Sequence, residues 1–296
     1  MEAVMKDLLN IGVVNFKTVW GDKSANLAHM EAYVTEAAGR GCEFIVFPET
    51  ALTGYSSEPD VPYEKKMHVV NAETIPGPAT EKMAELAKKY HMFIVFGMPE
   101  KSGDVVYNSA AIIHPDGTTE SYRKLHLPFD ESGWAVRGDE PKLIDTPWGP
   151  VGITICYDTY CFPEITRYYR AKGARLTLNV TACPDAPCTL GSAQLGLPAY
   201  ALVNYIYIAS SNIIGQEKQN HFAGGSGVIG PVSGGAKAFV GHTFSDADRE
   251  EEGLFSGVID LSLADKNAEI PIFRRNEKGQ MDWRHDLYAR LYERID

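Results

Sequence analysis

The sequence has no long hydrophobic run. No window approaches the roughly 18 consecutive apolar residues that a membrane-spanning helix requires, and the longest apolar segments are of strand length. The N-terminal residues 1–10 carry Glu2, Lys6 and Asp7 and lack the organisation of a signal peptide. We therefore expect no membrane partner and a cytoplasmic location.

Basic side chains are few relative to acidic ones. The chain of 296 residues has 28 Lys and Arg against 39 Asp and Glu, which gives a formal net charge of −11. A general binder of nucleic acids or of anionic membranes needs a net basic face. This charge argues against a nucleic-acid partner, although it leaves room for a local basic patch.

Cysteine is also sparse. Five cysteines are an odd number and too few over this length for a disulfide framework, so at least one thiol is free. Cys183 and Cys188 lie close together near prolines, but no histidine or second cysteine pair stands nearby at a zinc spacing. We expect these two residues to be incidental thiols, and we expect the protein to need no metal ion and no cofactor.

The sequence does contain an alternation of strand-length apolar runs and amphipathic helices. A hairpin turn is predicted at Pro115-Asp116-Gly117, and no linker or low-complexity run divides the chain. We therefore predict an α/β fold in one domain over 1–296, with two layers of sheet and helices outside both. The predicted strands lie at 11–16, 43–47, 92–98, 151–156, 176–180, 205–209 and 255–261.

Three of the predicted strands end in chemically reactive side chains. These are Glu49 after the strand at 43–47, Lys124 after the hairpin, and Cys156 at the end of the strand at 151–156. In α/β proteins, ligands bind where loops converge beyond the carboxyl ends of strands. Each residue taken alone is more often a surface or core residue. Together, a carboxylate, an ammonium group and a thiol are what acyl transfer through a cysteine requires.

These residues lie in three motifs that resemble those of the nitrilase, or carbon–nitrogen hydrolase, superfamily. Lys124 follows Glu49 by 75 residues and precedes Cys156 by 32. The resemblance extends from about residue 11 to about residue 261 and implies a four-layer αββα sandwich. The motifs are Phe47-Pro48-Glu49, Tyr122-Arg123-Lys124-Leu125-His126-Leu127 and Gly152-Ile153-Thr154-Ile155-Cys156-Tyr157-Asp158.

The resemblance also implies a catalytic triad of Glu49, Lys124 and Cys156, with Glu131 as a second glutamate near the lysine. A free thiol has a pKa of about 8.5, so Cys156 needs a neighbouring base and positive charge. In this scheme Glu49 accepts the thiol proton, and Lys124 stabilises the charged oxygen of the tetrahedral intermediate. His126 is an alternative base, but Glu49 already fills that role.

Further pocket residues are expected from their positions near the motifs. The backbone N–H of Tyr157 is the natural second donor to the charged oxygen. For Tyr55 and Trp134, packing in the core is an equally good interpretation. The residues that we expect to contact the substrate are Tyr55, Asn108, Trp134, Tyr157 and Asp158.

The tripeptide at the nucleophile favours an amide as the substrate. Nitrile-hydrolysing members of the family usually have Cys-Trp-Glu, whereas this chain has Cys156-Tyr157-Asp158, which is similar to amidases and carbamoylases. Thr159 and Tyr160 stand where carbamoylases that bind an amino-acid carboxylate commonly have an arginine. We therefore predict hydrolysis of a small, neutral or mildly polar, non-peptide amide to a carboxylic acid and ammonia through a cysteine thioester.

Three other functions stay open at this point. In order of preference, they are hydrolysis of an N-carbamoyl amine or amino acid, hydrolysis of a nitrile, and binding without catalysis. The resemblance further implies a homodimer or a higher homo-oligomer, and we expect the C-terminal tail 270–296 to pack on a partner subunit.

Overall fold

The computed structural model describes residues 5–186, 192–231, 240–242, 251–265 and 270–295. Cys188, predicted to be an incidental thiol, lies outside them. In the described ranges, no helix is both long and apolar enough to cross a membrane.

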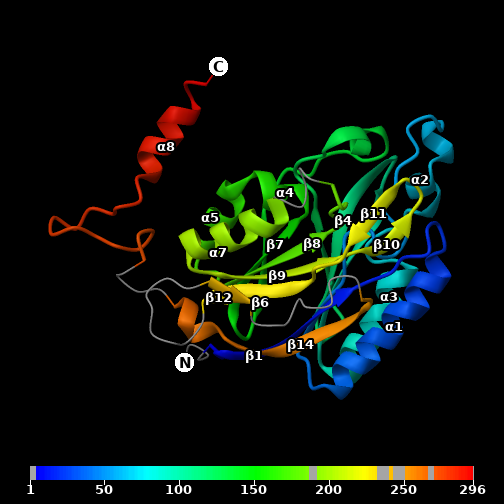
Figure 1. Ribbon diagram of the computed structural model, residues 1–296, viewed down its shortest axis with the longest axis horizontal. Helices are drawn as coiled ribbons and strands as arrows, with labels where there is room; N and C mark the ends of the chain where they lie inside the picture. The colour runs from blue at the N-terminus through cyan, green and yellow to red at the C-terminus, as the bar shows by residue number, and fades with distance from the viewer. Residues whose placement is uncertain (1–4, 187–191, 232–239, 243–250, 266–269, 296) are drawn as a thin grey trace.

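Two six-stranded sheets pack face to face at the centre of the protein (Figure 1). The first sheet has the order β14-β1-β2-β3-β4-β5, and the second has the order β13-β12-β9-β8-β7-β6. The strands of the first are β14 (Gly253–Asp260), β1 (Leu8–Asn15), β2 (Phe44–Val46), β3 (Phe93–Ser102), β4 (Val105–Ile113) and β5 (Thr119–Arg123). Those of the second are β13 (Val240–His242), β12 (Gly227–Pro231), β9 (Tyr207–Asn212), β8 (Leu176–Thr181), β7 (Gly149–Ile155) and β6 (Lys142–Thr146).

Helices cover the outer face of each sheet. The helices α1 (Lys23–Gly39) and α3 (Pro78–Tyr90) pack on the first sheet, and α5 (Pro163–Ala171) and α7 (Leu197–Asn204) pack on the second (Figure 1). The result is the predicted four-layer αββα sandwich. The shorter helical elements are α2 (Met67–Asn71), α4 (Tyr157–Cys161), and the turns Tyr63–Lys65, Phe129–Gly133, Ser192–Gly196 and Leu261–Ala264.

Local sequence explains where several of these elements begin. The Asp22 side chain accepts a hydrogen bond from the Ala25 N–H at the start of α1. Proline stands in the first turn of both α3 and α5, where no backbone N–H is needed. The Asp116 carboxylate accepts from the Thr118 N–H and closes the turn between β4 and β5.

The core between the sheets is apolar and fully buried. Alternate residues on the facing strands supply it, as the two-residue period of a strand requires. Burial of each large aliphatic side chain stabilises the fold by about 1.5–3 kcal/mol. Its members include Ile11, Val13, Phe44, Val46 and Val95 from the first sheet and Ile153, Ile155, Leu178 and Val180 from the second.

Two elements near the site are absent from the sequence-based prediction. One is the hairpin of β10 (Ile214–Glu217) and β11 (Asn220–Ala223), and the other is the five-residue helix α4 directly after Cys156. Both are too short for a hydrophobic period to identify them.

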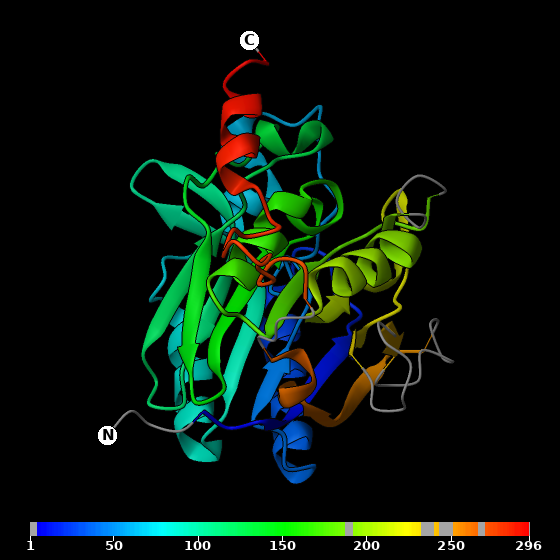
Figure 2. The ribbon, with the colours of Figure 1, turned by 90° about the vertical axis from the view of Figure 1, so that its left-hand side faces the viewer.

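The C-terminal helix α8 (His285–Tyr292) extends away from the sandwich (Figures 1 and 2). None of its residues is buried. The Tyr292 hydroxyl donates to Glu164 Oε1 of α5 at 2.8 Å, and Tyr288, Leu291 and Tyr292 are exposed. This helix therefore contributes little to the core of its own chain.

Candidate active site

The three predicted catalytic residues follow strands whose carboxyl ends meet between the two sheets. Glu49 lies shortly beyond β2, Lys124 directly follows β5, and Cys156 directly follows β7. In the first sheet β2 is parallel to β3, and β4 is antiparallel to both β3 and β5, so β2 and β5 end at the same edge. The topology therefore brings together groups that are far apart in the sequence.

A close backbone approach positions Glu49. The Gly97 N–H of β3 donates to the Pro48 carbonyl at 2.9 Å, and the Leu52 N–H donates to the Gly97 carbonyl at 3.2 Å. A Cβ atom at position 97 would lie 2.5 Å from the Glu49 Cα and 2.3 Å from the Thr50 N. Only glycine fits there without displacing the segment that carries Glu49.

Gly97→Ala should therefore move the Glu49 carboxylate and lower kcat by about 10- to 100-fold. Ammonia release from a substrate amide measures this effect. The matched control is Gly227→Ala on β12, where an added Cβ meets no atom within 4 Å. Full activity of Gly97→Ala would show that the site tolerates displacement of this backbone.

Lys124 lies between two buried carboxylates. Its Nζ donates to Glu49 Oε1 at 2.7 Å and to Glu131 Oε1 at 2.6 Å, and all three side chains are nearly or fully inaccessible to solvent. Asn108 Nδ2 donates to Glu49 Oε1 at 2.7 Å and to Glu131 Oε2 at 3.3 Å. The Tyr55 hydroxyl donates to Glu131 Oε1 at 2.8 Å. These bonds join the two carboxylates and the ammonium group in one network.

The network has more negative than positive charge when both glutamates are ionised. Burial, together with the charge of Glu49, raises the pKa of Glu131 from 4.5 to about 7. Burial opposes ionisation of Lys124 as well, but contact with Glu131 and Glu49 outweighs it and raises the lysine pKa well above its usual range. Lys124 is therefore a permanent cation, whereas Glu131 gains a proton near neutral pH.

Cys156 stands on a strained turn between β7 and α4. Its backbone angles are φ 46° and ψ −98°, a region that non-glycine residues rarely adopt, and such strain concentrates at functional sites. Burial and the nearby charge of Glu49 raise the pKa of its thiol well above the ordinary value. The resting thiol is therefore protonated despite the nearby lysine, and it needs a base at the moment of attack.

A cavity of about 440 Å³ opens onto Cys156. Tyr55 and Tyr157, both predicted to contact the substrate, line it. Cys183, predicted to be incidental, lies in the same wall and is close enough to influence the Cys156 pKa. The residues that line the cavity are Tyr55, Ser57, Pro128, Phe129, Asp130, Cys156, Tyr157, Tyr160, Cys161, Ala182, Cys183, Pro184, Ala186, Gln219 and Asn220.

Three residues predicted to contact the substrate are not in this lining. Asn108 lies behind the carboxylates and binds both of them. Trp134 is 2% exposed and stacks on His68, with ring centroids 4.2 Å apart. For Trp134 the core-packing interpretation therefore fits the structure, and the substrate contact does not.

Asp158 is also absent from this lining. Its carboxylate accepts from the Tyr122 hydroxyl at 2.7 Å and from the backbone N–H groups of Leu125 and His126. The bonds fasten the turn after Cys156 to the segment that carries Lys124. The His126 ring bonds the same carboxylate at 2.8 Å and stacks on Phe162, so it is not placed as a base for Cys156.

Glu217 is a positioning residue that the sequence analysis missed. Its buried carboxylate accepts from the N–H groups of Tyr55 and Ser56 and from the Thr18 hydroxyl. It thereby holds the loop from which Tyr55 reaches Glu131. Glu217 belongs to the unpredicted strand β10, and no motif in the sequence marks it.

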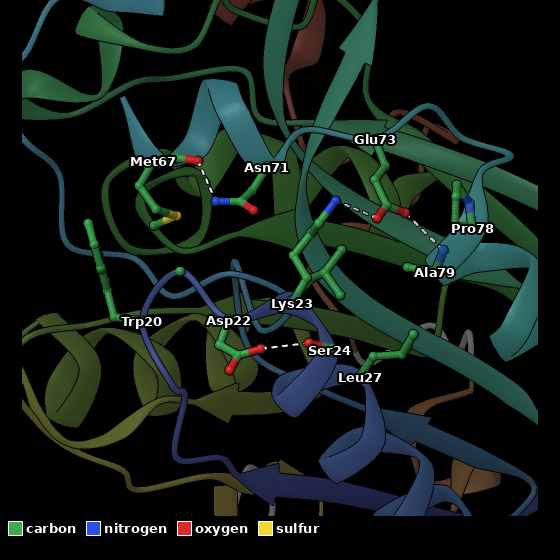
Figure 3. A pocket seen from close by; sticks show the side chains of 12 residues that line it. Trp20, Asp22, Lys23, Ser24, Leu27, Met67, Asn71, Glu73, Pro78 and Ala79 are labelled. Atoms are coloured by element: carbon green, nitrogen blue, oxygen red, sulfur yellow. Dashed lines mark hydrogen bonds and ion pairs between the residues drawn. The ribbon is translucent and has the colours of Figure 1, made fainter. Parts of the chain in front are cut away.

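A second cavity, of about 780 Å³, lies where α1 and α3 begin (Figure 3). Its charged groups bind one another, since Lys23 Nζ contacts Glu73 Oε1 at 2.7 Å and Glu73 Oε2 accepts from the Ala79 N–H. Its described lining contains no cysteine, and its Ser24 hydroxyl donates to the Asp22 carboxylate that caps α1. The cavity at Cys156 is thus the candidate active site, and no group of potential metal ligands occurs among the residues that the structure describes.

Comparison with known proteins agrees with this geometry. The family model described as carbon-nitrogen hydrolase matches residues 10–268. The human omega-amidase NIT2 is 31% identical over 281 residues, which cover 90% of this chain and 92% of that protein. A nitrilase of Pyrococcus abyssi is 34% identical over 241 residues, covering 80% of this chain and 84% of that protein.

The fold also matches solved structures. A mutant of an amidase from Nesterenkonia, of the nitrilase superfamily, superposes with a TM-score of 0.75 at 22% identity, covering 98% of this chain and all of that one. Another mutant of that amidase carries the acetamide moiety of fluoroacetamide on its active-site cysteine, and it superposes with a TM-score of 0.72 at 23% identity, covering 90% and 97% of the two chains. The chain belongs to the carbon–nitrogen hydrolase family and is a hydrolase of carbon–nitrogen bonds other than peptide bonds.

Proposed function

We propose that the protein is an amidase that hydrolyses a small amide to a carboxylic acid and ammonia through a thioester on Cys156. The observation that carries this proposal is the ion network of Glu49, Lys124 and Glu131 beside a buried thiol at one cavity. The names of the relatives, which include omega-amidases and amidases, support the same reaction class.

In the first half-reaction, Glu49 accepts the proton of the Cys156 thiol as sulfur attacks the amide carbon. The raised thiol pKa requires this coupled transfer. Lys124 Nζ stabilises the developing oxyanion, with the Tyr157 N–H as second donor at the first position of α4, where helical N–H groups lack intrahelical acceptors. Protonated Glu49 then gives its proton to the departing nitrogen, and ammonia leaves.

In the second half-reaction, Glu49 accepts a proton from water as the oxygen attacks the thioester carbonyl. The carbon–sulfur bond breaks, the acid leaves, and the proton returns to the Cys156 sulfur. Glu131 does not exchange protons with the substrate in this scheme. It holds Lys124 in place, and the Tyr55 hydroxyl holds Glu131.

The test is a panel of small amides, N-carbamoyl amines and nitriles, assayed for ammonia and carbon dioxide. Ammonia without carbon dioxide from amides, and a hydroxamate when hydroxylamine replaces water, would support the thioester route. Carbon dioxide from carbamoyl compounds, turnover of nitriles alone, or binding without turnover would each replace the proposal with one of the other functions.

We also propose that 1–296 form one domain that assembles into a homodimer or higher homo-oligomer, with the tail 270–296 packed on a partner subunit. The exposed aromatic and aliphatic side chains of α8 support this proposal. Deletion of 276–296, which keeps the buried Ile270 and Ile272, should lower the mass measured by light scattering. An unchanged mass would exclude this role for the tail.

A further inference from the structure

In the part of the chain that the structure describes, no Lys or Arg side chain lines the cavity at Cys156, and Lys124 lies beyond that lining between Glu49 and Glu131. Recognition of a carboxylate usually relies on arginine or lysine, because hydrogen bonds to a charged donor are the strong ones. The described wall thus offers no ion-pair partner to an anionic substrate.

Several neutral side-chain donors of the cavity wall already have acceptors. The Ser57 hydroxyl donates to Asp130 Oδ2, the Tyr55 hydroxyl donates to Glu131, and Asn220 Nδ2 donates to the Ser56 Oγ. Gln219 Nε2 donates to the Ser57 carbonyl at 3.5 Å. A carboxylate that entered the cavity would compete with these acceptors for the same donors.

Among the described residues that line the cavity, the charged side chain is a carboxylate. Asp130 is an exposed carboxylate at its rim, next to Phe129, an apolar side chain that is 84% exposed. At the other end, the ammonium group of Lys124 is shared by two glutamates. Like charges in one partly desolvated cavity repel each other more strongly than they do in water.

We infer that this active site selects against amides that carry a carboxylate and accepts neutral or cationic amides, and that Asp130 is a residue that determines this specificity. The inference rests on the proposed amidase function. Asp130 sits at the rim and contacts neither the thiol nor Glu49 in the described contacts, so its charge acts on the distal end of the substrate. Its removal should change the selectivity between charged and neutral substrates more than it changes the turnover of a neutral amide.

Two isosteric pairs of amides test this inference. Succinamide and succinamate differ in one terminal group, an amide against a carboxylate, and pentanamide and protonated 4-aminobutanamide differ in a methyl against an ammonium group. For the parent enzyme, we expect kcat/KM per amide group to be at least about tenfold higher for succinamide than for succinamate. We expect 4-aminobutanamide to match or exceed pentanamide.

Asp130→Asn should raise kcat/KM for succinamate relative to that for pentanamide by about three- to tenfold, and it should lower kcat/KM for 4-aminobutanamide relative to that for pentanamide. Asparagine can still accept the hydrogen bond from Ser57, so the rim keeps its shape. The matched control is Asp116→Asn, which removes the same charge from the exposed turn between β4 and β5 and should alter neither ratio.

A second measurement does not depend on turnover. In a Cys161→Ala background, alkylation of Cys156 by iodoacetamide and by iodoacetate is followed by mass spectrometry and normalised to free cysteine. The ratio of the alkylation rate with iodoacetamide to that with iodoacetate should be about tenfold higher for Cys156 than for free cysteine. Asp130→Asn should lower this ratio.

The outcomes separate the two proposals. If no amide is hydrolysed, the proposed function fails, while the alkylation ratio still decides whether the cavity rejects anions. If amides are hydrolysed but succinamate equals or exceeds succinamide, or if Asp130→Asn leaves both the kcat/KM ratios and the alkylation ratio unchanged, the charge selectivity assigned to Asp130 is wrong.

Discussion

Cys156→Ala should abolish amide hydrolysis, with kcat reduced by at least about 10⁴-fold. The cysteine sulfur forms the thioester in the proposed route, and alanine has no group that could replace it as the nucleophile. The thiol is only 7% exposed and alanine is smaller, so the fold should survive the change. Ammonia release from succinamide or pentanamide measures the effect, with thermal unfolding as the check on folding.

The matched control is Cys161→Ala. Cys161 lines the same cavity but is exposed, and its thiol is not part of the ion network of Glu49, Lys124 and Glu131. Its activity should stay within about threefold of the parent. If Cys156→Ala keeps more than a hundredth of the parent activity, the thioester route is ruled out. If Cys161→Ala loses as much activity as is expected for Cys156→Ala, the assignment of the nucleophile to Cys156 is wrong.

The architecture could be predicted from sequence because the hydrophobic pattern and the turn residues agree along most of the chain. The buried strands at 43–47 and 151–156 appear as β2 and β7, and the turn at Pro115-Asp116-Gly117 joins β4 to β5. The prediction that chemistry gathers at strand ends is general for α/β folds, and it led to Glu49, Lys124 and Cys156. The family resemblance assigned these residues to one catalytic triad and added Glu131.

The direction of individual side chains could not be predicted in the same way. Asp158 is two residues from the nucleophile, yet its carboxylate accepts from the N–H groups of Leu125 and His126, and it is absent from the cavity lining. Asn108 was expected to contact substrate, but β4 places it behind the glutamates. Such directions depend on one turn of backbone and on contacts between distant segments, which a local pattern does not contain.

Cys183 illustrates the same limit. Its spacing from Cys188 resembles no metal motif, and in isolation it is an ordinary small residue. Its position in the cavity wall follows from β8, which runs parallel to β7 and ends beside it. Only the pairing of the two strands, which the sequence does not state, brings Cys183 next to Cys156.

Lys124→Met should destabilise the fold as well as inactivate the enzyme. Methionine has a similar length but no charge, so Glu49 and Glu131 would remain buried with Asn108 and no cation between them. Breaking a buried ion pair by removal of one partner typically costs about 3–5 kcal/mol. We expect a loss of this size in the free energy of unfolding at pH 8, measured by urea denaturation.

The loss should shrink at lower pH. Burial raises the pKa of Glu131 from 4.5 to about 7, so between these values the folded state binds more protons than the unfolded chain. The free energy of unfolding contributed by this group therefore falls as the pH rises through that window. Without Lys124, ionisation of Glu131 becomes still less favourable in the folded state, and the dependence on pH steepens. The variant should be closest to the parent near pH 5.

Glu131→Gln in combination with Lys124→Met should restore much of the stability at pH 8, because one of the two unpaired charges is then gone. The matched control is Lys66→Met, which removes another buried lysine, 7% exposed, whose Nζ donates to the Glu58 carbonyl. Lys66→Met should lose less than half as much free energy of unfolding as Lys124→Met. Its stability should show no added dependence on pH, since Lys66 does not lie between two carboxylates. Equal destabilisation of Lys124→Met at pH 5 and pH 8 would contradict the assignment of the effect to unpaired carboxylates, and a loss of packing would then explain it.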